Sequence, residues 1–205
     1  MQDPVFDQLQ QLYRTKGFHL FIVGGTSRDL LLNRSFSDRD YGTDATPEEE
    51  KAFLKEANYA FAKFGSLRLD YAGQSVDITT FRKEEGYQDF RHPGKVVFVK
   101  TPQEEYARRD FTINALYLDG EYRVLDYCGG LADLKNRIIR FIGEPARRVQ
   151  EDPLRIIRAE RFAELLSFTI EEKSQQAIDE YRYLLAKLNP EKIKEEERKG
   201  WKRIK

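Results

Sequence analysis

The first two thirds of the chain alternate short apolar runs with turn-forming residues, and the spacing within each run predicts a secondary structure. Phe6, Leu9 and Tyr13 recur at helical spacing. Asp3-Pro4 supplies a capping residue followed by a proline for the first turn, and Gly17 is suited to end a helix. The first predicted element is therefore an amphipathic helix between these two signals.

A strand, a turn and a second helix are predicted next. The continuous apolar run at 19–23, "HLFIV", indicates a buried strand. The following "GGTSRDLLL" predicts a tight turn into a helix that begins near Ser27. Beyond a strand that carries "SDRDYG", Thr46-Pro47 and three glutamates predict a helix that runs to about Phe64.

The middle of the chain changes from helical to alternating patterns. Period-two alternation between turn signals is typical of strands and hairpins. The pattern predicts, in chain order, two strands within 66–81 around Ala72-Gly73, a mobile polar loop over 82–95, a strand over 95–100, a helix opened by a capping box at Thr101, and a hairpin over 114–127 that turns at Asp119-Gly120.

From about Pro145 the pattern is helical to the end of the chain. We therefore predict an α+β fold: a mixed β-sheet flanked by helices over residues 1–142, followed by an all-helical segment over 143–205. The 205 residues include 14 Phe and 11 Tyr, enough apolar material for a substantial core.

Charge and cysteine content narrow the class of protein. The formal net charge is zero, which does not by itself indicate a nucleic-acid binder, although the end from Asn189 onward is mostly Lys, Glu and Arg. One cysteine, Cys128, allows no internal disulfide. The apolar runs are too short to span a bilayer, and no secretory pattern follows Met1. These features predict a cytoplasmic protein without membrane contact.

The pair Gly24-Gly25 between a strand and a helix suggests a phosphate site. Glycines let an anion approach the backbone, and a helix N-terminus offers free N–H groups. Arg28 in the first turn would add charge-assisted hydrogen bonds. The alternative is an ordinary strand–turn–helix with a surface arginine.

Asp38 and Asp40 stand two positions apart on a predicted strand, so both side chains would point to the same face, roughly 6–7 Å apart. Such carboxylates repel each other unless a cation neutralises them, and Mg²⁺ favours this kind of oxygen ligand. Asp77 is a third acid within an apolar strand. The alternatives are a solvated strand edge with Arg39 as counter-ion, and an Asp77 paired with an arginine. Together with the glycine turn, the acids favour a two-metal phosphoryl-transfer site.

Six motifs extend the pattern and occur in a specific order. They are "VGGTSRDLLL", "SDRDYGTDATPEE", "VDITTFR", "RRDFTINAL", "DYCGGLADLKNRIIRFIGEP" and "QEDPLRIIRAERF". Over residues 18–165 the chain resembles the class II tRNA nucleotidyltransferase/poly(A) polymerase family. The resemblance implies a nucleotidyltransferase head domain over 1–142, a helical neck that reads the nucleotide base over 143–205, and template-independent addition of nucleotides to an RNA 3′ end.

The resemblance also implies roles for individual residues. Asp38 and Asp40 match the family's metal-binding carboxylates, with Mg²⁺ as cofactor, and Asp77 matches the third catalytic acid. The nucleotide-binding positions are Gly24, Gly25 and Arg28 for the triphosphate, Arg109, Asp110 and Asn114 for sugar and phosphates, Asp152 and Arg155 for the edge of the base, and Arg158 and Arg161 for phosphate or stacking contacts.

For the proposed nucleotide-binding residues from Arg109 onward, purely structural roles are the alternative. Arg109 and Asp110 also fit a capped helix start with exposed arginines, and Asp152 before Pro153 fits a helix cap. Arg158 and Arg161 fit a solvated, salt-bridged helix. The resemblance further implies that the loop around "GYQDFRHP" helps to switch nucleotide choice.

The expected activity is addition of CMP and AMP from CTP and ATP to the tRNA 3′ end, that is, CCA addition. A-only addition, CC-only addition and poly(A) synthesis share the same head motifs. Alternatives from other classes are a non-catalytic nucleotide- or RNA-binding fragment, and nucleotidyl transfer to a protein or small molecule. Family members run to about twice this length, so body and tail domains or a partner chain are expected to supply most of the RNA grip. The oligomeric state stays open.

Overall fold

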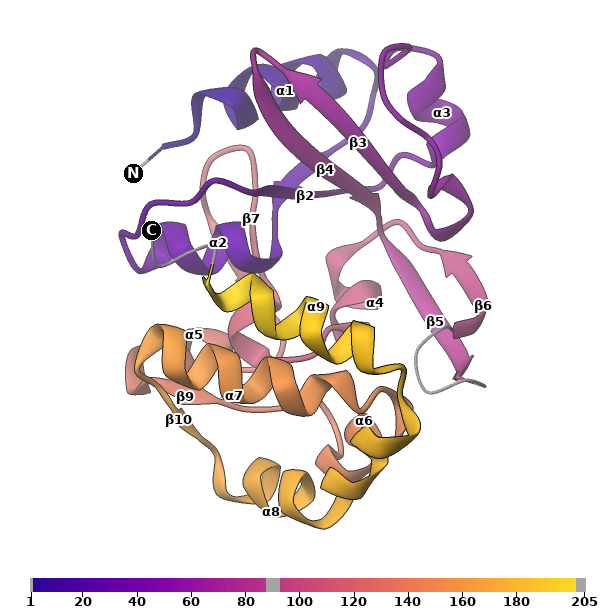
Figure 1. Cartoon of the computed structure of the whole chain (residues 1–205). Helices are drawn as coiled ribbons and strands as arrows, with labels where there is room; N and C mark the ends of the chain where they lie inside the picture. Colours follow the sequence, from indigo (N-terminus) through magenta and orange to yellow (C-terminus); the bar gives the residue numbers. More distant parts are fainter. Residues whose placement is uncertain (1, 88–92, 202–205) are drawn as a thin grey trace. The chain divides into compact units, whose positions relative to one another are not determined.

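The computed structural model describes residues 2–87 and 93–201, and its chain forms two compact units (Figure 1). Unit 1 comprises Met1–Glu84, Val96–Arg108 and Asn114–Tyr127, and unit 2 comprises Glu85–Lys95, Arg109–Ile113 and Cys128–Lys205. The predicted boundary at residue 142 is placed where the sequence pattern becomes helical, and it stays a prediction.

Unit 1 contains a six-stranded mixed sheet with the strand order β3-β4-β2-β1-β7-β8. β2 and β4 run parallel, and the other neighbouring pairs are antiparallel. The predicted mixed sheet is therefore confirmed. Its strands are β1 (Leu20–Ile22), β2 (Arg39–Thr43), β3 (Ser66–Tyr71), β4 (Gln74–Thr80), β7 (Leu116–Leu118) and β8 (Val124–Asp126).

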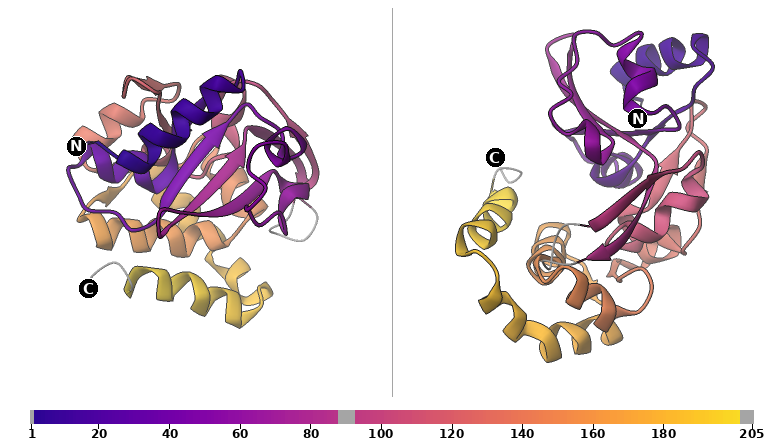
Figure 2. Two further views of the ribbon diagram at one scale, coloured as in Figure 1. Left: turned by 90° about the horizontal axis from the view of Figure 1, so that it is seen from above. Right: turned by 90° about the vertical axis from the view of Figure 1, so that its right-hand side faces the viewer.

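Short helices surround this sheet. The longest, α1, is capped by the Asp3 carboxylate, which accepts a hydrogen bond from the Val5 amide, and it lies across one face of the sheet (Figure 2). The helices of unit 1 are α1 (Pro4–Thr15), α2 (Gly24–Leu31), α3 (Pro47–Lys51) and α4 (Pro102–Glu105), with 3₁₀ turns η1 (Ala62–Phe64) and η2 (Tyr106–Arg108); η3 (Thr112–Asn114) begins in unit 2 and ends in unit 1.

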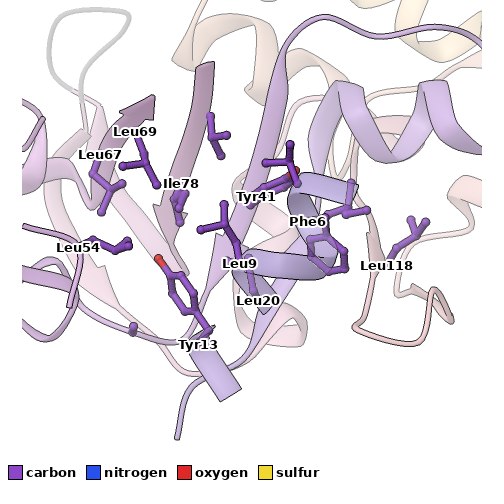
Figure 3. Packing of buried hydrophobic residues seen from close by; sticks show 14 of the residues in the cluster. Phe6, Leu9, Tyr13, Leu20, Tyr41, Leu54, Leu67, Leu69, Ile78 and Leu118 are labelled. Atoms are coloured by element: carbon purple, nitrogen blue, oxygen red, sulfur yellow. The ribbon is translucent and has the colours of Figure 1, made fainter. Parts of the chain in front are cut away.

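The two faces of the sheet differ in chemistry because side chains alternate along each strand. Figure 3 shows Phe6, Leu9 and Tyr13 of α1 packed against residues of the strands. On β4, the fully buried Ile78 faces this core, whereas its neighbour Asp77 points to the opposite face. Apolar packing on the core face holds the sheet against α1, and the opposite face carries the polar side chain of Asp77.

Unit 2 is mainly helical. Its aromatic centre joins Phe111 to Phe141, whose rings stack at 5.0 Å between centroids, and to Phe162 at 5.7 Å. α6 packs on α8, and α7 packs on α9. The elements are α5 (Gly130–Asn136), β9 (Ile138–Ile139), α6 (Pro145–Glu151), α7 (Leu154–Leu166), β10 (Thr169–Ile170), α8 (Glu172–Tyr181), the 3₁₀ turn η4 (Arg182–Lys187) and α9 (Pro190–Trp201).

Several element predictions are confirmed. The first helix, the strand at 19–23, the helix start at Thr46-Pro47, the hairpin around Ala72-Gly73 and the hairpin over 114–127 all form. No described helix is long and apolar enough to cross a membrane.

Other predictions were wrong. The helix expected from Thr46 to Phe64 ends at Lys51, because the following segment leaves to form a β-bridge between Asn58 and Arg68 of β3. The second helix begins at Gly24 rather than near Ser27.

The polar stretch 82–95, expected as a loop, instead contributes to two paired strands, β5 (Arg82–Tyr87) and β6 (Pro93–Phe98). Residues 88–92, the tip of the loop that the resemblance associates with nucleotide choice, lie outside the described residues. Thr101 gives no side-chain cap to α4; its hydroxyl donates to Glu104 instead, at 2.9 Å. The segment after residue 142 contains the short strand β10, parallel to β9, so it is not purely helical.

Candidate active site

The chain from Asp38 to Asp40 is held by the side chain of Thr26, a buried residue in the first turn of α2. The Thr26 hydroxyl donates to the Asp38 carbonyl at 3.0 Å and accepts from the Asp40 amide at 2.9 Å. The Val23 amide at the end of β1 adds a hydrogen bond to the Asp40 carbonyl at 3.0 Å. These contacts fix the backbone that carries both carboxylates, of which Asp38 is exposed and Asp40 half-buried.

Asp77 lies beside Asp40 because of the parallel pairing of β2 with β4. The two residues are direct partners in this pairing, so their side chains leave the same face of the sheet. This is the face opposite the core. The structure therefore brings Asp40 and Asp77 together, although they come from segments almost 40 residues apart, and Asp38 lies just before the first residue of β2.

Asp77 is also paired with an arginine. The Arg68 guanidinium on β3 donates from Nε to Oδ1 at 2.7 Å and from Nη2 to Oδ2 at 2.8 Å. The hydrogen bonds to Asp77 and its charge raise the pKa of Arg68, and Asp38 and Asp40 add to the shift. All three acids therefore act on the charge of Arg68. Asp77 has the arginine partner that the alternative expected, but its side chain is 41% exposed rather than buried.

The first residue of α2 has a backbone conformation that favours glycine. Gly24 has φ of +66°, which favours glycine because a side chain would be strained there. No side chain caps the helix at Val23, and Gly24 and Gly25 are both partly exposed. The first N–H groups of the helix therefore have no intrahelical acceptor and can bind an anion.

Arg28 is part of α2, but its side chain does not lie at the surface, where a bound phosphate was expected to meet it. Its side chain is fully buried in unit 1, where Nε donates to Asp29 and Nη1 donates to the Asn114 side-chain oxygen, both at 2.9 Å. Arg28 therefore joins α2 to the turn that holds Asn114. This arrangement positions two predicted nucleotide-binding elements relative to each other.

In unit 2, Asp110 is buried with its carboxylate occupied. Oδ1 accepts from the Phe111 amide at 2.8 Å, and Oδ2 forms an ion pair with Arg158 of α7. The backbone carbonyl of the neighbouring Arg109 accepts from Arg148 at 2.6 Å. The "RRD" motif is thus tied to α6 and α7 by arginines.

Asp152 and Arg155 lie at the junction of α6 and α7. Asp152 Oδ1 accepts from the Leu154 amide at 3.1 Å, although the N-cap of α7 is Pro153 rather than Asp152. The buried Arg155 donates from Nη1 to the Arg148 carbonyl at 2.7 Å and to Glu151 at 3.0 Å. Burial works to raise the pKa of Glu151, but Arg148, Arg155 and Arg147 outweigh it and lower the pKa.

Arg158 and Arg161 point toward Glu196 of α9. Arg161 Nη2 donates to Glu196 Oε1 at 2.8 Å, and Arg158 Nε is 4.0 Å from the same oxygen. Burial opposes ionisation of Glu196, whereas Arg158, Lys199 and Arg161 favour it, and the net effect lowers its pKa. Both arginines are thus salt-bridged, as the alternative expected, but Arg161 is not solvated, since its side chain is only 11% exposed.

The predicted site residues therefore fall into two groups. Unit 1 holds Gly24, Gly25, Arg28, Asp38, Asp40, Asp77 and Asn114. Unit 2 holds Arg109, Asp110, Asp152, Arg155, Arg158 and Arg161. Their functional roles remain predictions.

Three residues of the site escaped the sequence analysis. Thr26 stood inside a quoted motif, but its partners lie 12 and 14 residues away and no local pattern indicates them. Glu151 stood beside Asp152 and could have been found from the three arginines at helical spacing around it. Arg68 was detectable from the register of the predicted hairpin.

The metal prediction rests on Asp38 and Asp40. Among the described residues, no group of three or more His, Cys, Asp or Glu is arranged to hold a metal ion. Two carboxylates nevertheless suit Mg²⁺, which usually takes one or two protein carboxylates and fills its other positions with water and substrate phosphates. The donor set fits this ion.

Comparison with known proteins gives a consistent result. The pattern of the poly A polymerase head domain matches residues 20–140. A CCA-adding enzyme of Lactobacillus helveticus is 46% identical over 193 residues, which cover 94% of this chain and 47% of that protein.

Solved structures agree with the sequence comparisons. The Bacillus stearothermophilus CCA-adding enzyme in complex with CTP matches with a TM-score of 0.86 at 34% identity, over 95% of this chain and 48% of that one. The Thermotoga maritima CCA-adding enzyme in complex with tRNA matches with a TM-score of 0.76 at 27% identity, over 95% and 47%. The chain thus spans about half the length of the relatives that it matches.

Proposed function

This chain belongs to the poly(A) polymerase head-domain family, and on that basis we propose that it transfers CMP and AMP from CTP and ATP to the 3′ end of tRNA. The observation that carries the proposal is the pairing of Asp40 with Asp77 on the sheet face opposite the core. The names of its relatives support CCA addition as the specific activity.

In this proposal Asp38 and Asp40 hold Mg²⁺. When bound, such ions lower the pKa of the RNA 3′-hydroxyl and neutralise charge that develops on the leaving pyrophosphate. Thr26 keeps the two carboxylates in register by fixing the backbone between them. Asp77 orients toward the same face and contributes negative charge there.

The nucleotide is bound by further residues of the chain. The N–H groups at Gly24 and Gly25 receive the triphosphate, and buried Arg28 maintains the position of Asn114. Asp110 accepts from the ribose 2′-hydroxyl, a contact that distinguishes ribonucleotides from deoxyribonucleotides.

The base is read by Asp152 and Arg155. A carboxylate accepts from the exocyclic amine of cytosine or adenine, and a guanidinium donates to ring nitrogen or carbonyl oxygen. Glu151 holds Arg155 in place for this contact. Arg109, Arg158 and Arg161 complete the proposed nucleotide-binding set. The cytoplasm, where tRNA is processed and a chain with one cysteine stays reduced, is the proposed location.

The test is incorporation of labelled CTP and ATP, with Mg²⁺, into three tRNAs that lack CCA, end in C or end in CC. We expect CTP addition followed by ATP addition, and no addition in the presence of EDTA. Asp40→Asn should lower the rate roughly a thousandfold or more, because the metal site supplies several kcal/mol of transition-state stabilisation. Asp70→Asn, which removes an exposed acid on β3, should retain activity.

Other outcomes assign other functions. ATP addition to the CC-ended tRNA alone would replace CCA addition by A-only addition. Binding of ATP without any incorporation, by the wild-type chain and the Asp40→Asn variant alike, would reject the enzymatic proposal and indicate a nucleotide-binding module.

A further inference from the structure

Arg68 lies on the sheet face of unit 1 that carries Asp40 and Asp77, and the proposed function assigns it no role. It is the direct antiparallel partner of Asp77, which is in turn the partner of Asp40, so all three side chains leave the same face of the sheet. Asp38 and Asp40 both contribute to its raised pKa. Arg68 therefore stands beside the acids and on the β3 edge of the sheet.

The Arg68 guanidinium is held in one orientation, but only some of its N–H donors are bonded to Asp77. A guanidinium has five N–H donors, and within the described residues Arg68 hydrogen-bonds through Nε and Nη2 to Asp77 alone. Its side chain is 66% exposed. The bidentate pair orients the remaining donors toward solvent, so an incoming anion would be bound without the usual loss of arginine side-chain freedom.

Sheet order places this arginine opposite the proposed triphosphate site. α2 follows β1, whereas Arg68 lies on β3, three strands away across the Asp40–Asp77 pair in the order β3-β4-β2-β1. Neighbouring strands are 4.7–4.9 Å apart, which puts β3 about 14 Å from β1. Two anion-binding features thus flank the carboxylates.

The geometry of in-line displacement determines on which side of the carboxylates the pyrophosphate leaves and on which side the RNA approaches. The attacking and leaving oxygens lie on opposite sides of the transferred phosphorus. With the triphosphate at α2, as the proposed function has it, pyrophosphate leaves on the β1 side. The RNA 3′-hydroxyl must then approach Asp40 over β4 and β3, and the RNA backbone comes with it.

We propose that Arg68 binds a backbone phosphate next to the 3′-terminal nucleotide of the acceptor RNA. This inference rests on the proposed function and adds a contact for the acceptor strand. The pairing with Asp77 serves it directly, because Asp77 holds the guanidinium in place beside the attacking hydroxyl.

The competing explanation is that Arg68 only neutralises Asp77. The two explanations differ when both charges are removed. If neutralisation is the whole role, Arg68→Gln combined with Asp77→Asn will bind RNA as tightly as the wild type. If Arg68 binds phosphate, the double variant will bind RNA as weakly as Arg68→Gln.

The experiment measures binding of a fluorescent RNA hairpin that ends in CC, by anisotropy over a series of KCl concentrations. We expect Arg68→Gln to weaken binding roughly 10- to 150-fold, the value of a hydrogen bond between charged groups. The slope of log K against log salt should fall by about 0.7, as for one phosphate of a single strand. Arg68→Lys should recover part of the affinity, since it keeps the charge and loses the bidentate geometry.

The matched control is Arg123→Gln, because Arg123 is 70% exposed and pairs with Asp119 in the β7–β8 turn. Its affinity and salt slope should equal those of the wild type. An unchanged slope in Arg68→Gln, or RNA affinity restored in the double variant, would overturn the proposal. So would a wild-type chain that fails to bind the hairpin at the lowest salt.

Nucleotide incorporation separates this inference from the proposed function. At saturating RNA, Arg68→Gln should still incorporate ATP, and its KM for RNA should rise by a larger factor than its KM for ATP. Normal incorporation with an unchanged KM for RNA would reject the Arg68 contact and leave the proposed function intact.

Discussion

Glu50 is an acid enclosed in the core of unit 1. It lies on α3, is fully buried, and accepts a hydrogen bond from the Tyr13 hydroxyl on α1. Burial raises its pKa to about 8; the hydrogen bond from Tyr13 opposes this shift, and the charge of Glu49 adds to it. The Tyr13 pKa is raised as well, mainly by burial and then by Glu50. Both groups are therefore neutral in the folded chain at neutral pH.

This buried acid predicts that stability falls as pH rises. The unfolded chain releases the Glu50 proton near 4.5, whereas the folded chain keeps it to about 8. Between these values the folded state binds more protons, so the free energy of unfolding decreases by up to about 1.4 kcal/mol per pH unit. Glu50→Gln removes this dependence and should raise the melting temperature at pH 8.

Thermal unfolding of both chains from pH 5 to about 8 checks this prediction. Glu48→Gln is the control, because Glu48 is exposed on the same helix and pairs only with Lys51 among the described residues. Equal pH slopes for wild type and Glu50→Gln would show that Glu50 ionises normally.

The Arg68–Asp77 pair illustrates how far sequence reasoning reaches at this scale. A two-residue turn at Ala72-Gly73 pairs residues whose numbers sum to 145, and this rule alone joins 68 to 77. The pairing of Asp40 with Asp77 follows no such rule, because parallel strands are joined by long connections whose register is set by packing.

At the scale of elements, the Thr26 hydroxyl of α2 holds the backbone at the start of β2. Thr26→Val keeps the shape of the side chain but removes both hydrogen bonds to the backbone of Asp38 and Asp40. We expect a loss of about 1–2 kcal/mol of stability. We also expect at least a roughly tenfold drop in the incorporation rate, because the carboxylates lose their fixed separation.

The control for this change is Ser27→Ala in the same helix. Ser27 is equally buried, and its hydroxyl donates to the Gly24 carbonyl at 3.0 Å. It should lose stability without the drop in rate. Equal rates for the two variants would mean that Thr26 does not position the acids.

α9 is attached to α7 by a buried charge. Glu196 is 6% exposed and faces Arg158 and Arg161, with Lys199 on its own helix. Glu196→Gln leaves these cations without their counter-ion and should cost roughly 1–3 kcal/mol. Chemical denaturation followed by circular dichroism measures this cost.

Glu195→Gln is the matched change one position away, where the side chain is 53% exposed and pairs with Lys192. It should alter stability by less than about 0.5 kcal/mol. A similar loss in both variants would indicate that α9 is held by its apolar residues rather than by Glu196.

The wrong prediction of a helix up to Phe64 shows that tertiary contacts can override local sequence signals. The capping box at Thr46 and Glu49 started α3 as expected. The helix nevertheless stops at Lys51, since Asn58 exchanges backbone hydrogen bonds with Arg68 at 2.7 and 3.1 Å. Pairing with the edge of β3 satisfies backbone groups that a longer helix would have satisfied internally.

For the whole molecule, the division into two compact units was not evident from the pattern. Unit 2 takes up Arg109–Ile113 from the middle of the chain, because Phe111 packs with Phe141 and Phe162. These contacts span more than 25 residues of sequence. The "RRDFTIN" motif is therefore shared, with Arg109 and Asp110 in unit 2 and Asn114 in unit 1.

The sequence by itself determined the mixed sheet, most of its strands, the first helix, the glycine turn and the family, because alternation, capping and motif order are local properties of the chain. Only the tertiary structure decided which residues meet. It put Asp77 beside Asp40, gave Asp77 its arginine, buried Arg28 against Asn114 and enclosed Glu50 with Tyr13. The physical reason is that burial and long-range register depend on the packing of the entire core, which no short window of sequence contains.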